Sequence, residues 1–474
     1  MPIFKSLLIA TLFFACTHAI GADKSPAYTR ADLSAASTLR ERALSDATGW
    51  QLVESLTTEV GARFAGSAGD RAAVVWAERE MKRLGLSNVR TMDVVVPHWI
   101  RGEAELAIVS PSPQLMPTLA LGGSIGTPEQ GIEADAVMVK DIAALTALPE
   151  DAVKGRIVFF TNRMERTRDG TGYLRAVAVR SQGPAEAAAR GAAAVVIRSI
   201  GTGDHRLPHT GRTVYKPEGP RIPALAISNP DADTLERLFA GNKPVRLRLK
   251  SSARELSDTR SANVIGEVPG SDRGRQIIIL GAHLDSWDPG VGAIDDGAGV
   301  AIMMGAAKLI RELPAKPRRT IRVVLFANEE FGTSGSRTYL NSLADELDRH
   351  VLGFEADFGA GPVWRLTSRV NPAQLPAVEQ IFRALAPLRL ARGDNQALGG
   401  ADLSGLAKLG MPLLSPDLDG INYFDVHHSA NDTLRMVDPQ ALRQSTAAFA
   451  VSVWLAAQYA GEWERVDTAK PPGR

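Results

Sequence analysis

The sequence predicts an α/β protein in which a mostly parallel sheet is flanked by helices. Residues 276–280 and 322–328 form mostly apolar runs, which is the composition of strands buried on both faces of a parallel sheet. Helical patterns alternate with such runs across residues 262–465, most clearly at 297–313 and 442–459. A strand–helix alternation of this kind is typical of a sheet that carries helices on both faces.

The length of the chain indicates more than one domain. Its 474 residues exceed the roughly 100–200 residues of a typical single core. Residues 123–255 have their own alternation of short strands and helices, so we expect an inserted domain there. This domain would divide the main domain into an N-terminal part at 23–122 and a C-terminal part at 256–466, which a polar tail at 467–474 follows.

Two local patterns characterise the N-terminal part of the main domain. Apolar residues recur at helical spacing over residues 69–84, and Gly85 is expected to end this helix. The valine-rich residues 89–96 predict a strand, which we expect to stop at Pro97 because proline donates no ladder hydrogen bond.

The first 22 residues have the organisation of a secretory signal peptide. A short basic start precedes an apolar stretch of about ten residues and then small residues, so we expect cleavage after Ala22, with Ala19 as the alternative. The sequence therefore predicts an exported protein, periplasmic or extracellular. Cys16, the only cysteine, would allow lipid attachment instead, but residues 13–15 match a lipoprotein signal poorly.

Composition narrows the classes of partner. Apolar residues make up 45% of the chain and charged residues 23%, as in ordinary soluble globular proteins. A formal net charge of +1 gives no indication of a nucleic-acid partner. We expect no stable membrane span, because the N-terminal apolar stretch is shorter than the about 20 residues that a span requires.

Histidine and carboxylate side chains lie where the predicted strands end. His283 and Asp285 follow the first apolar run, and Glu329 and Glu330 follow the second. Ligands of open α/β sheets bind at this edge, and imidazole together with carboxylate is a donor set that suits zinc. Further candidates are clustered at 292–297, 355–357 and 424–433. These side chains would serve two zinc ions about 3.5–4 Å apart, joined by a shared carboxylate.

The adjacent glutamates can divide the chemistry between them. In extended backbone, neighbouring side chains point in different directions, so one glutamate can bind metal while the other faces the substrate. The second glutamate could take a proton from water and pass it to a leaving amine.

Five motifs in this order resemble the co-catalytic zinc exopeptidases of the M28 class. The motifs are His-Leu-Asp-Ser-Trp-Asp (283–288), Gly-Ala-Ile-Asp-Asp-Gly-Ala-Gly (292–299), Asn-Glu-Glu-Phe-Gly (328–332), Glu-Ala-Asp (355–357) and His-His-Ser-Ala-Asn-Asp-Thr (427–433). Residues 153–250 resemble a protease-associated domain inserted into the peptidase. The resemblance covers nearly the whole chain after the signal peptide, and it implies the zinc exopeptidase fold.

The resemblance also implies a role for each site residue. Asp295 bridges two zinc ions. His283 and Asp357 complete one zinc site, and Glu330 and His428 complete the other. Glu329 is the general base and acid, and Asp285 lies behind His283 and fixes its orientation. The implied activity is hydrolysis of dipeptides or short peptides, with aminopeptidase action on longer peptides as the alternative. A homodimer is expected by analogy alone.

Alternatives remain at several positions. Asp296 could replace Asp295 as a ligand, and His427 is interpreted as a packing neighbour of the site rather than a ligand. His205 and His209 are expected to be loop residues that shape an entrance, and Trp287 to be a wall of the site. A non-catalytic binding protein on the same fold would lack some of the ligands. A phosphoesterase would need a cluster of basic residues near the site, which the sequence does not show.

Overall fold

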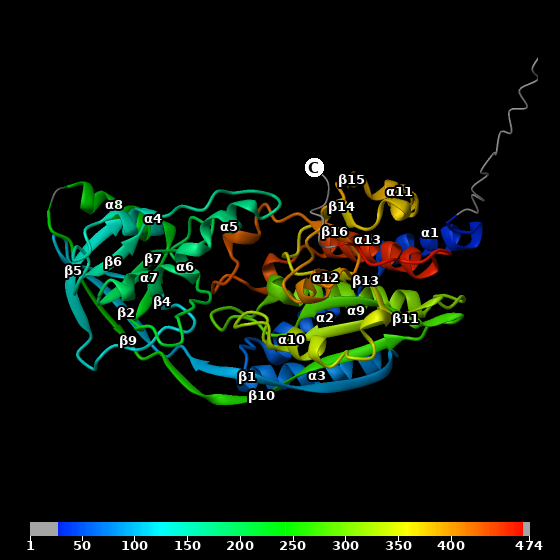
Figure 1. The fold of residues 1–474 in the computed structure, drawn as a ribbon, viewed down its shortest axis with the longest axis horizontal. Coiled ribbons are helices and arrows are strands. Elements are labelled where there is room, and N and C mark those ends of the chain that lie inside the picture. Colours follow the sequence, from blue (N-terminus) through cyan, green and yellow to red (C-terminus); the bar gives the residue numbers. More distant parts are fainter. Residues whose placement is uncertain (1–26, 242, 468–474) are drawn as a thin grey trace, which may run out of the picture.

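The computed structural model describes residues 27–241 and 243–467. The expected signal peptide, Cys16 and nearly all of the polar tail lie outside the described residues. Two lobes, each built on an eight-stranded sheet, lie side by side (Figure 1). We name residues 104–251, which hold the second sheet, the inserted lobe, and we name the other described residues the main lobe.

The sheet of the main lobe has a parallel centre. Four neighbouring strands run in the same direction in the order β12 (Arg319–Phe326), β11 (Arg273–His283), β13 (His350–Glu355) and β16 (Leu413–Leu418). Antiparallel pairing occurs toward both margins, which are formed by β10 (Arg254–Val268), β1 (Ser87–Ile100), β14 (Val363–Arg369) and β15 (Ala391–Arg392). The predicted α/β class is confirmed, with the parallel strands concentrated at the centre of the sheet.

Helices cover both faces of this sheet because successive strand residues face opposite sides. In β11, Ile278 and Leu280 pack in the core that contains helices α9 and α13, whereas Ile279 packs in the core that contains α10 and α12. The bounds of the helices on the first face are α1 (Arg30–Ser45), α2 (Thr48–Ser55), α9 (Ala298–Arg311) and α13 (Pro439–Gln458). Those of the other helices in this lobe are α3 (Ala68–Arg83), α10 (Ser334–Asn341), α11 (Leu375–Ala384) and α12 (Ser404–Lys408).

Helix α3 forms as the sequence predicts. The side chain of Ser67 accepts a hydrogen bond from the backbone amide of Asp70 and caps the helix. After Leu84 the chain turns at Gly85, whose φ of +77° favours glycine.

Strand β1 differs from its prediction, because it continues through Pro97 to Ile100. The pairing of β1 with β10 shifts register between Val96 and His98, which leaves Pro97 outside the ladder. A proline can occupy such a bulge because no ladder hydrogen bond is required of it. The expectation that the strand stops at Pro97 was therefore wrong.

The inserted lobe contains a mixed sheet in the order β3-β2-β9-β5-β6-β7-β8-β4. Its strands are β2 (Ala104–Ser110), β3 (Gln114–Met116), β4 (Thr118–Ala120), β5 (Ile132–Val139), β6 (Ile157–Phe160), β7 (Ala194–Arg198), β8 (Ala224–Ile227) and β9 (Arg246–Ser251). Its helices are α4 (Ile142–Ala147), α5 (Thr171–Ala176), α6 (Ala178–Ser181), α7 (Gly183–Ala189) and α8 (Asn229–Ala240).

The inserted lobe begins earlier than the predicted boundary at residue 123. Strands β2, β3 and β4 precede that residue, yet they belong to the second sheet: β2 pairs with β3 and β9, and β4 pairs with β8. Strands β1 and β10 form a long antiparallel ribbon that runs from the main sheet to this lobe (Figure 1). The inserted lobe is thus connected to the main lobe through two adjacent strands.

Among the described residues, we find no helix with both the length and the apolar character needed to cross a membrane.

Candidate metal centre

The predicted site residues meet at the carboxyl ends of the parallel strands. His283 is the last residue of β11, Asp357 closely follows β13, and Glu329 and Glu330 follow β12. These three strands are direct neighbours in the sheet, so the segments that leave them emerge at one edge. His428 reaches the same place from the loop after β16, just past a short helical turn (Tyr423–Asp425).

Asp295 lies on an irregular segment between β11 and α9. Its backbone has φ −135° and ψ +85°, so residues 293–297 are not a continuous helix, and the Asp295–Asp296 peptide bond is cis. The side chain of Asp432 accepts a 2.8 Å hydrogen bond from the Ile294 amide and supports this segment. Burial, together with the nearby Asp295 carboxylate, raises the pKa of Asp432 to about 7.

Arg63 fixes the loop that connects His283 to Asp295. It is fully buried, and its guanidinium donates to three carbonyl oxygens of that loop. The accepting residues are Leu284 at 2.6 Å, Val291 at 2.6 Å and Gly292 at 2.8 Å. A planar guanidinium suits this role because its donors have a fixed geometry. Arg63 is one of the site-supporting residues that no sequence pattern indicated.

The carboxylate of Asp295 lies between two groups of possible metal ligands. Its Oδ1 is 3.2 Å from Nε2 of His283, and that nitrogen is 3.4 Å from Oδ1 of Asp357. Its Oδ2 is 3.3 Å from Nε2 of His428, and that nitrogen is 3.0 Å from Oε2 of Glu330. The structure therefore brings together all five residues for which the sequence suggested metal binding.

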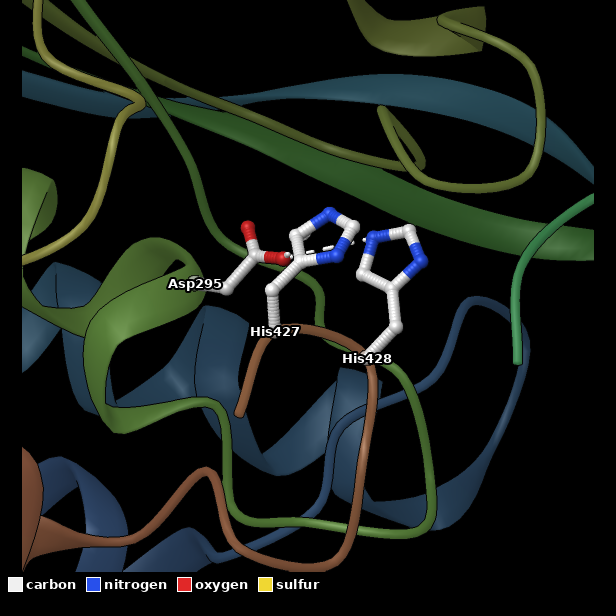
Figure 2. A group of neighbouring side chains, drawn as sticks. All are labelled: Asp295, His427 and His428. Carbon is white, nitrogen blue, oxygen red and sulfur yellow. Dashed lines mark ion pairs between the residues drawn. The ribbon is translucent and has the colours of Figure 1, made fainter. Parts of the chain in front are cut away.

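His427 also points toward Asp295. Figure 2 shows the imidazoles of His427 and His428, from one loop, beside the Asp295 carboxylate. Nε2 of His427 is 3.7 Å from Oδ2 of Asp295, and its ring stacks on His428 with a centroid distance of 3.5 Å. His428 has a φ of +58°, a left-handed conformation that costs about 1–2 kcal/mol for a residue with a Cβ. Surrounding contacts must hold His428 in this conformation.

The carboxylate of Asp296 makes different contacts from that of Asp295. Its Oδ2 accepts a hydrogen bond from the His283 amide at 3.1 Å, and its Oδ1 accepts one from the Gly299 amide at 3.0 Å. The possible ligand atoms of His283, Asp296 and Asp357 still lie close enough together to hold a metal ion. However, both carboxylate oxygens of Asp296 already serve backbone amides, whereas Oδ2 of Asp295 has no hydrogen-bond partner. This contrast favours Asp295 as the ligand.

Asp285 supports both sides of the site. Nδ1 of His283 donates to the Asp285 backbone carbonyl at 3.0 Å, while the Asp285 carboxylate is 3.7 Å from the same nitrogen. The carboxylate instead accepts hydrogen bonds from the amides of Glu329, at 2.9 Å, and Glu330, at 3.3 Å. Orientation of His283 thus comes from the main chain of Asp285, and its side chain positions the two glutamates.

The electrostatics of the cluster favour a cation. Burial raises the pKa values of Glu329 and Glu330 well above the usual range, and the surrounding carboxylates raise them further. Burial lowers the pKa of His283, but the carboxylates of Asp357, Asp285 and Asp295 outweigh it and raise that pKa well above normal. Oδ2 of Asp295 and Oε1 of Glu330 are buried without hydrogen-bond partners. Such an imidazole and carboxylate set fits zinc, which would compensate the crowded negative charge.

Most of the cluster lines a cleft of about 710 Å³ to which both lobes contribute. The main lobe contributes Glu329, Asp357 and His428 to its lining, and the inserted lobe contributes Tyr173 and Arg180. The inserted lobe therefore forms part of the wall of this cleft.

Arg180 is a second functional candidate that sequence patterns did not indicate. Its side chain is 6% exposed, its Nη2 donates to the Tyr173 hydroxyl at 2.6 Å, and its Nη1 lies 3.4 Å from Nδ1 of His428. Its Nη1 also donates to the Thr210 carbonyl at 3.4 Å, whereas its Nε has no hydrogen-bond partner. Within residues 27–241 and 243–467, no carboxylate forms an ion pair with it. A buried guanidinium without an acidic partner is available to an anionic ligand.

The remaining predicted residues surround the metal cluster. Trp287 is buried, with its ring centroid 5.6 Å from that of His428, and so forms a wall. His205 and His209 stack on each other at 5.6 Å, and Nε2 of His205 lies 2.6 Å from the Asp425 carbonyl. Neither belongs to a metal-competent group among the residues that the structure describes. His205 contacts the loop that carries His428, and neither histidine is among the described residues that line the cleft.

The fold and this cluster define a metallohydrolase. The chain belongs to the peptidase family M28, whose model matches residues 263–453, and it is therefore a metallopeptidase. Carboxypeptidase Q of Bos taurus is 33% identical over 402 residues, which covers 85% of this chain and 84% of the relative. Carboxypeptidase Q of Homo sapiens is 32% identical over the same length and coverage. Aminopeptidase YwaD of Bacillus subtilis is 27% identical over 68% of this chain and 63% of its own.

Solved structures agree with this family. A peptidase M28 precursor from Shewanella amazonensis has a TM-score of 0.91 at 44% identity, and covers 92% of this chain and 99% of its own. A zinc aminopeptidase from Bacillus subtilis has a TM-score of 0.62 at 21% identity, over 89% of this chain and 98% of its own. The second likeness shows the fold alone.

Proposed function

We propose that the protein is an exported exopeptidase with two zinc ions, acting on dipeptides or short peptides. Asp295 would bridge the ions, with His283 and Asp357 on one side and Glu330 and His428 on the other. The observation that carries this proposal is the position of the Asp295 carboxylate, whose oxygens lie 3.2 and 3.3 Å from the two imidazoles. A carboxylate placed between two nitrogen donors suits a pair of zinc ions.

Bound zinc would supply a water of lowered pKa and polarise the carbonyl of the peptide bond. Glu329 lines the cleft beside the cluster and is held through its amide by Asp285. Its carboxylate takes a proton from the attacking water and returns it to the nitrogen of the leaving residue. Burial raises the pKa of Glu329, and a carboxyl group with a raised pKa is suited to donating a proton to the leaving nitrogen.

Arg180 supports a preference for substrates with a free carboxylate. It lies on the His428 side of the cluster, within the same cleft, with no acidic partner in the described chain. The terminal carboxylate of the leaving residue would provide that partner, and a guanidinium can bind it through two hydrogen bonds. This contact limits how far a substrate extends beyond the cleaved bond, which favours dipeptides over long chains.

The alternatives are less well supported. A non-catalytic binding protein needs none of the five ligands or Glu329, yet all six converge here. Aminopeptidase action on longer peptides agrees with the similarity to aminopeptidase YwaD, but it gives the cleft-lining guanidinium of Arg180 no substrate carboxylate to bind. We further propose that residues 104–251 are an inserted domain that completes the cleft.

A panel of peptides tests the proposed function. We expect hydrolysis of unblocked dipeptides, which stops on treatment with a zinc chelator and returns on addition of zinc. Acetylating the amino end or amidating the carboxyl end should each slow cleavage. If the chelator-treated protein contains no zinc and still turns over the dipeptide as fast as the untreated protein, the zinc-dependent mechanism is excluded.

A further inference from the structure

The loop that carries His428 is held by the inserted lobe rather than by the main sheet alone. The amide of Gly420 donates to the Arg168 carbonyl at 3.0 Å, and the amide of Thr202 donates to the Phe424 carbonyl at 2.9 Å. The amide of Thr210 donates to the carbonyl of His428 itself at 2.9 Å. In Figure 1 the segment around α5 and the chain after β16 lie side by side between the lobes.

Asp425 is the centre of these contacts. Its Oδ1 accepts hydrogen bonds from Nη2 of Arg166 at 2.5 Å and from the Thr202 hydroxyl at 2.7 Å. Its Oδ2 accepts from Nη1 of Arg166 at 2.9 Å, so the arginine binds this carboxylate through two nitrogens. His205 contacts the Asp425 carbonyl at 2.6 Å. The side chain and main chain of Asp425 are therefore both tied to the inserted lobe.

Arg166 also bonds directly to the turn that precedes His428. Its Nη1 donates to the Ile421 carbonyl at 2.8 Å and to the side chain of Asn422 at 3.2 Å. Its Nη2 donates to the Thr202 carbonyl at 3.1 Å. A single guanidinium thus joins the inserted lobe to both ends of the short helical turn Tyr423–Asp425.

We propose that Arg166 is a positioning residue for the metal site formed by Glu330 and His428. It acts through Asp425, and the inference rests on the proposed zinc function. His428 needs such support because its φ of +58° is unfavourable without surrounding contacts. When Arg166 is lost, the turn relaxes and the imidazole leaves the position in which it meets Glu330. His283 ends β11 and Asp357 closely follows β13, so the site that these two residues form stays in place.

The test compares Arg166→Met with the matched variant Arg163→Met. Arg163 lies on the same segment, but it pairs with Asp233 and Glu236 inside the inserted lobe. Each apoprotein is titrated with Zn²⁺ against a chromophoric chelator, and circular dichroism confirms that it is folded. In Arg166→Met we expect one of the two zinc affinities to fall about 10- to 100-fold, the size typical of losing a ligand-supporting contact. In Arg163→Met both affinities should match those of the wild type.

Two further measurements make the result decisive. Anomalous scattering from crystals of Arg166→Met should locate the retained zinc at His283 and Asp357. The double variant Arg166→Met/Asp425→Ala should lose less zinc affinity at this site than the product of the losses measured in Arg166→Met and Asp425→Ala separately, because the two residues share a contact. Equal weakening of both zinc sites, or unchanged affinities, overturns the positioning role. Failure of the wild type to bind two zinc ions overturns the proposed function instead.

Discussion

The carboxylate of Asp285 accepts a 2.9 Å hydrogen bond from the backbone amide of Glu329. The residue next to the His283 side chain therefore also fixes the backbone of the residue proposed to move the proton. Changing Asp285 to Asn keeps the size but replaces one acceptor by a donor that faces the Glu329 or Glu330 amide. We expect kcat/KM to fall about 10- to 100-fold, while the free energy of unfolding falls by about 1–3 kcal/mol. Steady-state kinetics and urea unfolding measure the two effects, and unchanged kinetics would show that this contact is not needed.

Glu329→Gln separates proton transfer from metal binding. Because none of the proposed ligands changes, zinc content should stay at the wild-type value. Turnover should fall by about 10²- to 10⁴-fold, since the amide cannot accept the proton from water. Elemental analysis and turnover of an unblocked dipeptide give both values. Near-normal turnover in this variant would rule out Glu329 as the proton carrier.

Arg180→Met tests recognition of the substrate carboxylate. With the wild type, we expect kcat/KM for a dipeptide to exceed that for its carboxyl-terminal amide by about 100-fold, since a buried charge pair is lost in the amide. In the variant, the free dipeptide should lose about this factor, whereas the amide should be cleaved at nearly the wild-type rate. The amide is thus an internal control for damage to His428. A wild type that cleaves acid and amide equally well leaves Arg180 with no such role.

His350 gives a prediction for stability that does not involve the metal centre. Burial lowers its pKa from 6.5 to about 4, while its Nε2 lies 2.7 Å from the Tyr339 hydroxyl. Since the unfolded chain takes up the proton first, stability is fully present above pH 6.5 and is lost as pH falls toward 4. The contribution of His350 to the free energy of unfolding that is lost over this pH range is about 3 kcal/mol. We expect the difference in unfolding free energy between wild type and His350→Gln to shrink by this amount from pH 7 to pH 4. If the difference in unfolding free energy between wild type and His350→Gln does not depend on pH, the lowered pKa of His350 is contradicted.

The features that follow from contiguous sequence were predictable. Apolar runs without alternation can only be buried strands or helices, and the residues after β11, β12 and β13 meet because parallel neighbours end at one edge. Convergence of His283, Asp295 and Glu330 therefore follows from topology and local order.

Features that depend on distant pairing were not predictable. Arg63 bonds to a carbonyl 221 residues away in the sequence, and nothing near it indicates that partner. The short strands β2 and β3 are partly exposed, and they become strands because β2 pairs with both β3 and β9. The predicted boundary at residue 123 therefore lies after the first strands of the second sheet. Arg180 lies beside His428 only because the inserted lobe packs against the loop that carries His428.

The central claim is that two zinc ions share the carboxylate of Asp295. The most direct measurement is a crystal structure of the zinc-loaded protein with data collected on both sides of the zinc absorption edge. The account predicts two anomalous peaks about 3.5–4 Å apart, one beside His283 and Asp357 and the other beside Glu330 and His428, with both lost in Asp295→Ala. A single peak, or peaks away from Asp295, would contradict it.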